Sequence, residues 1–131
     1  MLTNMSAEPK FIDHPNVASN KDAYIDGVLD IAKALPSWQQ SLLAYKWLTS
    51  EGHAKPLDTL GGEQRTRYDE ALALLSSGKP LQKPIIGIGM VDNIEVGSGA
   101  AIVVLMAHKG ITQIPVHIRA GMAKKLMKFM V

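Results

Sequence analysis

Two glycine pairs, Gly87-Ile88-Gly89 and Gly97-Ser98-Gly99, come nearest in spacing to a known chemical motif. A Gly-x-Gly pair that opens a helix can turn backbone amides toward a phosphate group. Neither pair continues to a third glycine at the spacing of a dinucleotide motif, because Asp92 and Ile102 stand there. We also expect Gly99 to lead into a strand and not a helix. The sequence therefore predicts no nucleotide site and no cofactor.

Ser98 is the serine whose surroundings most resemble those of a catalytic nucleophile. A nucleophile elbow requires Gly-x-Ser-x-Gly, and the residues around Ser98 read Val-Gly-Ser-Gly-Ala. His108 or His117 could activate the hydroxyl, but nothing in the sequence fixes that geometry. We assign no catalytic residue, and an enzyme is less expected than a binding protein.

Histidine and cysteine content argues against a metal site. The four histidines, His14, His53, His108 and His117, form no close ligand pair, and the chain contains no cysteine. A metal would have to be held by histidines and carboxylates from distant segments, so we predict none. The absence of cysteine also excludes disulfides and fits a reducing compartment, which makes a cytoplasmic location the expectation.

Charge is distributed unevenly along the chain. The net charge is +2, of which residues 1–78 contribute −3 and residues 79–131 contribute +5. A basic C-terminal part can attract nucleic acid, an anionic ligand or an acidic protein, or it can complement the acidic part within one fold. The candidate partner-binding residues are His108, Lys109, His117, Arg119, Lys124, Lys125 and Lys128.

The last residues, 120–131, are predicted to form a short amphipathic helix. Its apolar side carries Met122, Leu126, Phe129 and Met130. Its other side carries Lys124, Lys125 and Lys128. Methionine-rich surfaces with a basic border suit adaptable binding, although such a helix can also pack on its own sheet and leave its lysines in water.

The N-terminal part of the chain is predicted to be helical. Residues 1–18 read as an irregular arm, because Pro9 and Pro15 interrupt any helix. Helices are expected over 19–35, which Pro36 should end, over 38–50 and over 63–76. Residues 19–78 would therefore form a helical part ahead of the sheet.

The stretch from residue 84 to 119 carries the strand signals. Strands are expected over 85–91, 94–96, 100–107 and 111–118. Because Pro115 cannot donate to a ladder, we place strand 111–118 at an edge of the sheet, where it could pair with a second copy of the chain in a homodimer. No segment reads as a membrane span, because Asp92, Asn93 and Glu95 interrupt the most apolar stretch.

These expectations combine into one domain over residues 1–131 of class α+β. Three N-terminal helices would be followed by a three- or four-stranded antiparallel sheet and a short C-terminal helix. The expected function is that of a small non-enzymatic binding or regulatory protein, which engages another protein through its sheet edge and basic C-terminal helix. The alternatives are a nucleic-acid-binding protein that uses the basic part, and a small-molecule-binding protein or small enzyme with a site near Gly97-Gly99.

Overall fold

A mixed four-stranded sheet forms the centre of the computed structural model, which describes residues 8–131. Its strand order is β2-β6-β4-β5, with bounds Tyr24–Asp30, Gln113–Arg119, Ile85–Ile88 and Ile94–Ser98 respectively. β2 and β6 are antiparallel, β6 and β4 are parallel, and β4 and β5 form an antiparallel hairpin. The class is α+β, as predicted. The sheet was predicted to be antiparallel throughout, and this is wrong because β4 and β6 are parallel.

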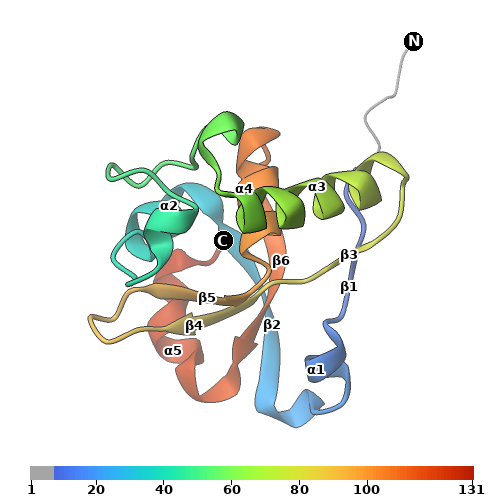
Figure 1. Cartoon of the computed structure of the whole chain (residues 1–131). Helices are drawn as coiled ribbons and strands as arrows, with labels where there is room; N and C mark the ends of the chain where they lie inside the picture. Colours follow the sequence, from blue (N-terminus) through green and yellow to red (C-terminus); the bar gives the residue numbers. More distant parts are fainter. Residues whose placement is uncertain (1–7) are drawn as a thin grey trace.

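Helices cover the sheet on both sides. In Figure 1, α2 (Ile31–Trp38), α3 (Gly62–Ser76) and α4 (Ala100–His108) lie above the β4–β5 hairpin, and α5 (Ala123–Leu126) lies below it. A separate pair of two-residue parallel strands, β1 (Phe11–Ile12) and β3 (Leu81–Gln82), joins the N-terminal arm to the segment ahead of β4. The arm continues into α1 (Pro15–Ala18). Short 3₁₀ turns occupy Lys21–Ala23, Ala44–Lys46, Leu57–Thr59, Ala120–Met122 and Met127–Phe129.

The predicted order of three N-terminal helices is wrong. The segment 19–35 contains the strand β2 and only the start of α2, and 38–50 contains a 3₁₀ turn within an irregular loop. Pairing with the distant strand β6 overrides the helical spacing of the apolar residues in β2, where Leu29 is fully buried. Pro36 lies inside α2, which continues two residues further. The one long helix in this part, α3, agrees with the helix expected over 63–76.

The strand predicted over 100–107 is the helix α4. A continuous apolar run fits a buried helix as well as a central strand, because periodicity alone does not separate them. In α4 the buried residues lie on nearly every side: Ala101, Val103, Val104, Leu105 and Met106. Gly99 precedes the helix with a φ of 91°, a left-handed conformation that glycine adopts without steric cost. The expectation that Gly99 leads into a strand was therefore wrong.

Strand 111–118 is not an edge strand, because β6 lies between β2 and β4. Pro115 pairs with Val28 of β2, whereas pairing with β4 begins only at His117, opposite Ile85. The His117 N–H points toward β4, where it donates to Pro84 O at 2.8 Å. The nitrogen of Pro115, two residues earlier, faces the same side beyond the end of β4, so its missing N–H leaves no ladder bond unmade. A homodimer through this strand has no free edge to use.

The C-terminal segment is a chain of helical turns that returns to the sheet. After α5 and the 3₁₀ turn Met127–Phe129, Met130 forms a bridge with Leu29. The N–H of Val131 donates to Val28 O at 2.8 Å. Leu126 and Met130 are buried, so the apolar side predicted for 120–131 packs on this protein's own core.

Within residues 8–131, no helix has both the length and the apolar character that crossing a membrane requires.

Candidate functional site

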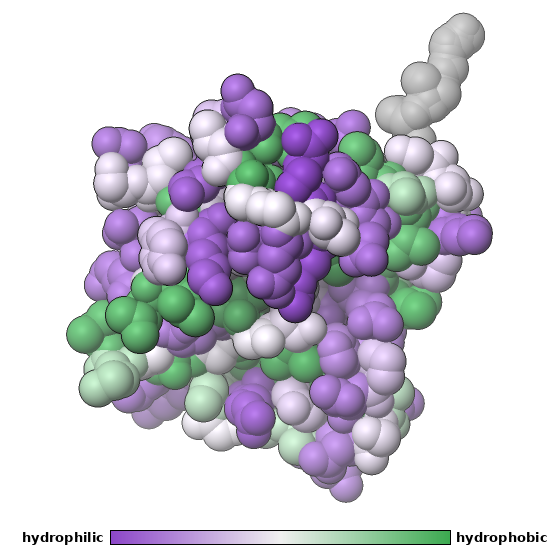
Figure 2. Space-filling view, viewed as in Figure 1, coloured by the Kyte–Doolittle hydropathy of each residue, from purple (hydrophilic) through white to green (hydrophobic). Residues whose placement is uncertain are grey.

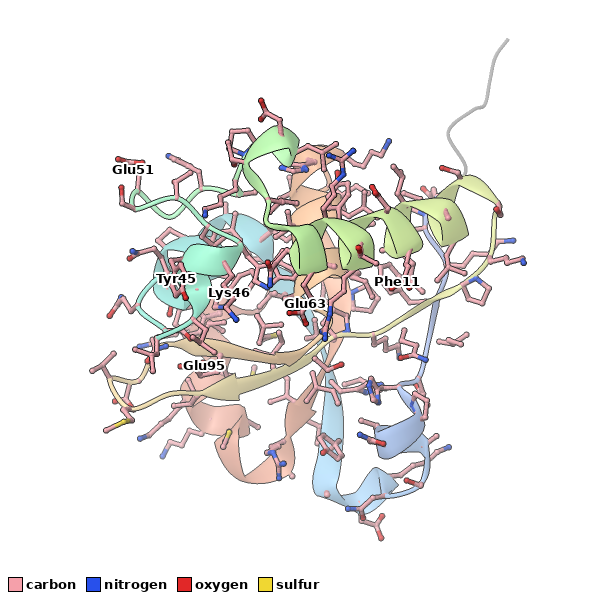
Figure 3. All side chains as sticks on the ribbon, viewed as in Figure 1. Phe11, Tyr45, Lys46, Glu51, Glu63 and Glu95 are labelled. Atoms are coloured by element: carbon pink, nitrogen blue, oxygen red, sulfur yellow. The ribbon has the colours of Figure 1, made fainter. Side chains whose placement is uncertain are left out.

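A cleft of about 950 Å³ runs beneath α3, and we call it the edge cleft. One wall is α3, the opposite wall is the loop 41–47, and the floor is the end of β5 with the start of α4. Its far end is closed by Ile12 and His14 of the arm and by residues 80–83. Figure 3 shows Lys46, Glu63 and Glu95, three charged side chains from three different elements, around this cleft.

The outer edge of β5 lies on the floor of the edge cleft. At one end of the strand the N–H of Ile94 points away from β4 and donates to the Ser37 hydroxyl oxygen at 2.8 Å. Because backbone groups alternate in direction along a strand, the N–H and C=O of Val96 also point outward. Among residues 8–131 no turn, loop or helix cap bonds to either group, and Val96 lines the cleft. The β5 edge, one of the two edges of this sheet, is therefore half covered by α2 and half open.

Glu95 holds the loop wall of the cleft to the sheet. Its carboxylate accepts hydrogen bonds from the Ser41 hydroxyl at 2.7 Å and from the Asn93 side-chain amide at 3.0 Å. The same amide, on a residue only 2% exposed, also donates to Ile94 O. These bonds position Leu42 and Leu43 at the rim, where both side chains are exposed.

Ser98 contacts a histidine, but neither of the two that the sequence suggested. Its hydroxyl lies 3.1 Å from Nε2 of His14, and Nδ1 of His14 accepts a hydrogen bond from the backbone N–H of Asn16. In the neutral ring the proton must then be on Nε2, which donates to Ser98. A histidine in this tautomer cannot take the serine proton, so the pair anchors the arm and does not form a nucleophile–base pair.

His117 is 1% exposed and ties the arm to the sheet. Its Nε2 accepts from the backbone N–H of His14 at 3.2 Å, and its Nδ1 lies 3.1 Å from the carboxylate of Asp26. The neutral ring therefore carries its proton on Nδ1 and donates it to Asp26.

Asp13, Asp26 and His117 are close enough together to raise the question of a metal site. Their ligand atoms lie within 4.8 Å of one another. However, the ammonium group of Lys83 lies 3.2 Å from Asp13 and 3.7 Å from Asp26. It supplies the positive charge that a cation would bring, so these residues do not suit a metal ion. The hydrogen bond from Lys83 holds the pKa of Asp13 below its usual value.

His108 serves as a connection between three elements. The Tyr68 hydroxyl lies 2.8 Å from Nδ1 of His108, and Nε2 of His108 lies 2.8 Å from the carbonyl oxygen of Lys55. A carbonyl can only accept, so Nε2 carries the proton and Tyr68 donates to Nδ1. Burial raises the pKa of Tyr68. The bonds join α3, α4 and the loop before Leu57.

Six of the seven predicted partner-binding residues fall into two groups, whereas His117 is buried within β6. His108 and Lys109 end α4, ahead of β6, whereas Arg119 ends β6 and lies 5.8 Å from the centre of the Tyr24 ring. A strand of seven residues separates the groups by about 20 Å. The lysines of the C-terminal turns are exposed beyond Arg119: Lys124, Lys125 and Lys128.

The sequence did not predict the edge cleft or its contacts. Its walls come from segments that are far apart in the chain, and His14 approaches Ser98 across 84 positions. One local signal was present: Gly99 is followed by two alanines, and alanine has the highest helix propensity, which favours a helix at that position.

Comparison with known proteins identifies a relative in fold only. No family model and no curated protein sequence matches the chain. Among solved structures, it is similar to the crystal structure of the Oncogenic Suppression Activity Protein, described as a plasmid fertility inhibition factor. The TM-score is 0.59 at 16% sequence identity, and the match covers 86% of this chain and 60% of that chain. This chain thus corresponds to less than two thirds of that protein.

Proposed function

We propose that this chain is a non-enzymatic binding or regulatory protein that engages another protein through the open end of β5 and the basic C-terminal segment. The observation that carries the proposal is the outward-facing N–H and C=O of Val96 on the floor of the edge cleft. An extended segment of a partner can add to such an edge through backbone hydrogen bonds. The expectation of a cytoplasmic location belongs to the same proposal.

The volume and the lining of the cleft support the binding of an extended polypeptide. Its volume of about 950 Å³ is at the upper end of the range for small-molecule pockets. Apolar side chains line its rims, among them Ile12, Leu42 and Leu74. Side chains of an added strand that point alternately up and down would meet α3 on one side and the loop wall on the other.

The similar solved structure is consistent with a regulatory role. That protein is described as a plasmid fertility inhibition factor, and inhibition of a process commonly rests on binding a component of it. At 16% identity the likeness concerns the fold alone.

Site-specific photo-crosslinking in cells tests the proposal. A photo-reactive amino acid at Leu74, on the cleft wall, should trap one protein partner, whereas the same residue at Lys109, at the far end of α4, should not. Val96→Pro removes the outward N–H without touching the β4 ladder, so it should abolish the crosslink. Val96→Ala keeps the backbone N–H, so this variant should still give the crosslink.

Three results would contradict the proposal. The crosslink at Leu74 could be unaffected by Val96→Pro, it could be absent, or the trapped molecule could be nucleic acid. The last result would favour the nucleic-acid alternative, for which affinity should fall steeply with salt and depend on Arg119 and the lysines of 124–128.

A second candidate, a small-molecule-binding protein, is favoured by the same cavity where it meets Gly97-Gly99. Gly99 opens α4, so the first backbone N–H groups of this helix lie at the cleft. Such groups suit a small anionic ligand. Native mass spectrometry of the purified protein would reveal a retained compound, and Val96→Pro should leave that compound bound.

A further inference from the structure

Five large apolar side chains stand out from two neighbouring loops, and we call them the apical patch: Leu42, Leu43, Tyr45, Met90 and Val91. Met90 is fully exposed and Leu42 is 88% exposed. Figure 2 shows hydrophobic residues gathered at the end of the β4–β5 hairpin, on the left of the view. Contiguous exposed apolar residues of this kind mark interaction sites more often than isolated ones do.

The apical patch is held in place by hydrogen bonds. The Ser41–Glu95 bond joins the loop that carries Leu42 to the hairpin that carries Met90. Within the hairpin turn, the side-chain oxygen of the buried Asn93 accepts from the N–H of Val91 at 3.4 Å. The turn therefore holds the backbone of Met90 and Val91 so that both side chains face solvent.

The border of the apical patch is basic. Its two nearby carboxylates are already engaged, because Asp92 pairs with Lys125 at 3.0 Å and Glu95 accepts from Ser41 and Asn93. The pair of Asp92 with Lys125 brings the C-terminal turns beside the hairpin end of the patch. These turns also carry Lys124 and Lys128, which are exposed and form no ion pair with a carboxylate of the described residues. The patch therefore combines an apolar centre with a lysine-bearing segment at one side.

We propose that the apical patch docks an acidic amphipathic helix of a protein partner. The apolar face of that helix would lie on Leu42 and Met90, and its carboxylates would face the lysines at the border. Methionine adapts to such a face because its side chain is flexible and polarizable. A second copy of this chain is a poorer occupant, since it would bring the same lysines against each other. This inference rests on the proposal that the partner is a protein, but not on strand addition at Val96.

A labelled model peptide tests the inference directly. The probe is a synthetic helix with leucine on one face and glutamate elsewhere, and binding to the full chain is followed by fluorescence anisotropy. Combined Met90→Ser and Val91→Ser should weaken binding about tenfold, because buried apolar area is lost, and leave its salt dependence unchanged. Combined Lys124→Gln and Lys128→Gln should also weaken binding and flatten its salt dependence.

Matched controls separate this surface from the rest of the molecule. Ile12→Ser, an exposed apolar residue at the far end of the cleft, and Lys109→Gln, at the far end of α4, should leave peptide binding within about twofold of the unmodified protein. Val96→Pro should also leave peptide binding unchanged. Failure of the strand-addition proposal and failure of the docking proposal therefore give different results.

Other outcomes would overturn the docking inference. They are no binding of the peptide, binding that Met90→Ser with Val91→Ser does not weaken, or binding that Val96→Pro abolishes. Phosphatidylserine vesicles and duplex DNA are tested in parallel with the same variants. If either binds through Met90 and the lysines while the peptide does not, the patch serves a membrane or a nucleic acid instead.

Discussion

The hydroxyl oxygen of Ser37 accepts a 2.8 Å hydrogen bond from the backbone N–H of Ile94. A helix side chain thereby completes the ladder of an edge strand at a position where Ile94 is fully buried. Beyond this bond the edge opens at Val96, so the single serine marks the boundary between the covered and the available part of β5.

Ser37→Ala should destabilise the protein by about 1–3 kcal/mol, because it leaves the buried N–H of Ile94 without a partner. Urea unfolding followed by circular dichroism measures the free energy of unfolding. Ser50→Ala is the control, since Ser50 is exposed and its hydroxyl, within the described part of the chain, bonds only to the neighbouring Glu51. Equal unfolding free energies for the two variants would show that the Ser37 bond does not cap the strand.

Gly99→Ala should destabilise the protein by about 2 kcal/mol or more. Gly99 has a φ of 91°, and an added Cβ would lie 2.9 Å from Cα of Pro84. Gly62→Ala is a matched change at the first residue of α3, where an added Cβ meets nothing within 4 Å, and its effect should stay within about 0.5 kcal/mol. Thermal unfolding compares the two, and similar melting temperatures would contradict the expectation.

Tyr68→Phe should remove the hydrogen bond to His108. It should also remove the part of the stability that the unmodified protein loses at high pH when the Tyr68 phenol ionises. Burial raises the pKa of Tyr68, so in the folded state the phenol stays neutral at a pH where it ionises in the unfolded chain. Its contribution to stability is therefore complete below about pH 10 and falls as the pH rises further. Urea midpoints from pH 8 to pH 11 should converge for the two proteins; a constant difference would argue against this role.

Asp13→Asn should destabilise the protein at neutral pH and matter less in acid. Lys83 lowers the pKa of Asp13, so the carboxylate stabilises the folded state above its unfolded pKa of about 4, and this contribution is lost as the pH falls through the folded value. The difference in urea midpoint between the two proteins should shrink from pH 6 to pH 3. Glu8→Gln, an exposed change on the same arm, should show no such trend.

The sequence predicted the α+β class, the helix α3 and the apolar side of the C-terminal segment, because each follows from a local pattern. It did not predict β2 or α4. In β2, the pairing partner lies about ninety positions away, as the Asp26–His117 contact illustrates. In α4, burial on almost every side erased the periodicity that distinguishes helix from strand.

The sequence predicted that a sheet edge would take part in binding, but it did not predict which strand forms that edge. A binding role for a sheet edge was expected, but the edge was assigned to 111–118 on the strength of Pro115. That proline is tolerated for a different reason, namely that β4 is too short to reach it. Which strand lies outermost depends on the order of strands in space, and no local pattern encodes that order.

The pairing of β2 with β6 also determines when the sheet can form during synthesis. β2 is synthesised well before β6, yet within residues 8–131 β6, which begins at Gln113, is its only strand neighbour. Until then, β2 on the nascent chain has no native strand to pair with, and such unpaired strands are prone to misassociation. Leu29, which is fully buried in the folded protein, therefore lacks its native strand cover until β6 has been made.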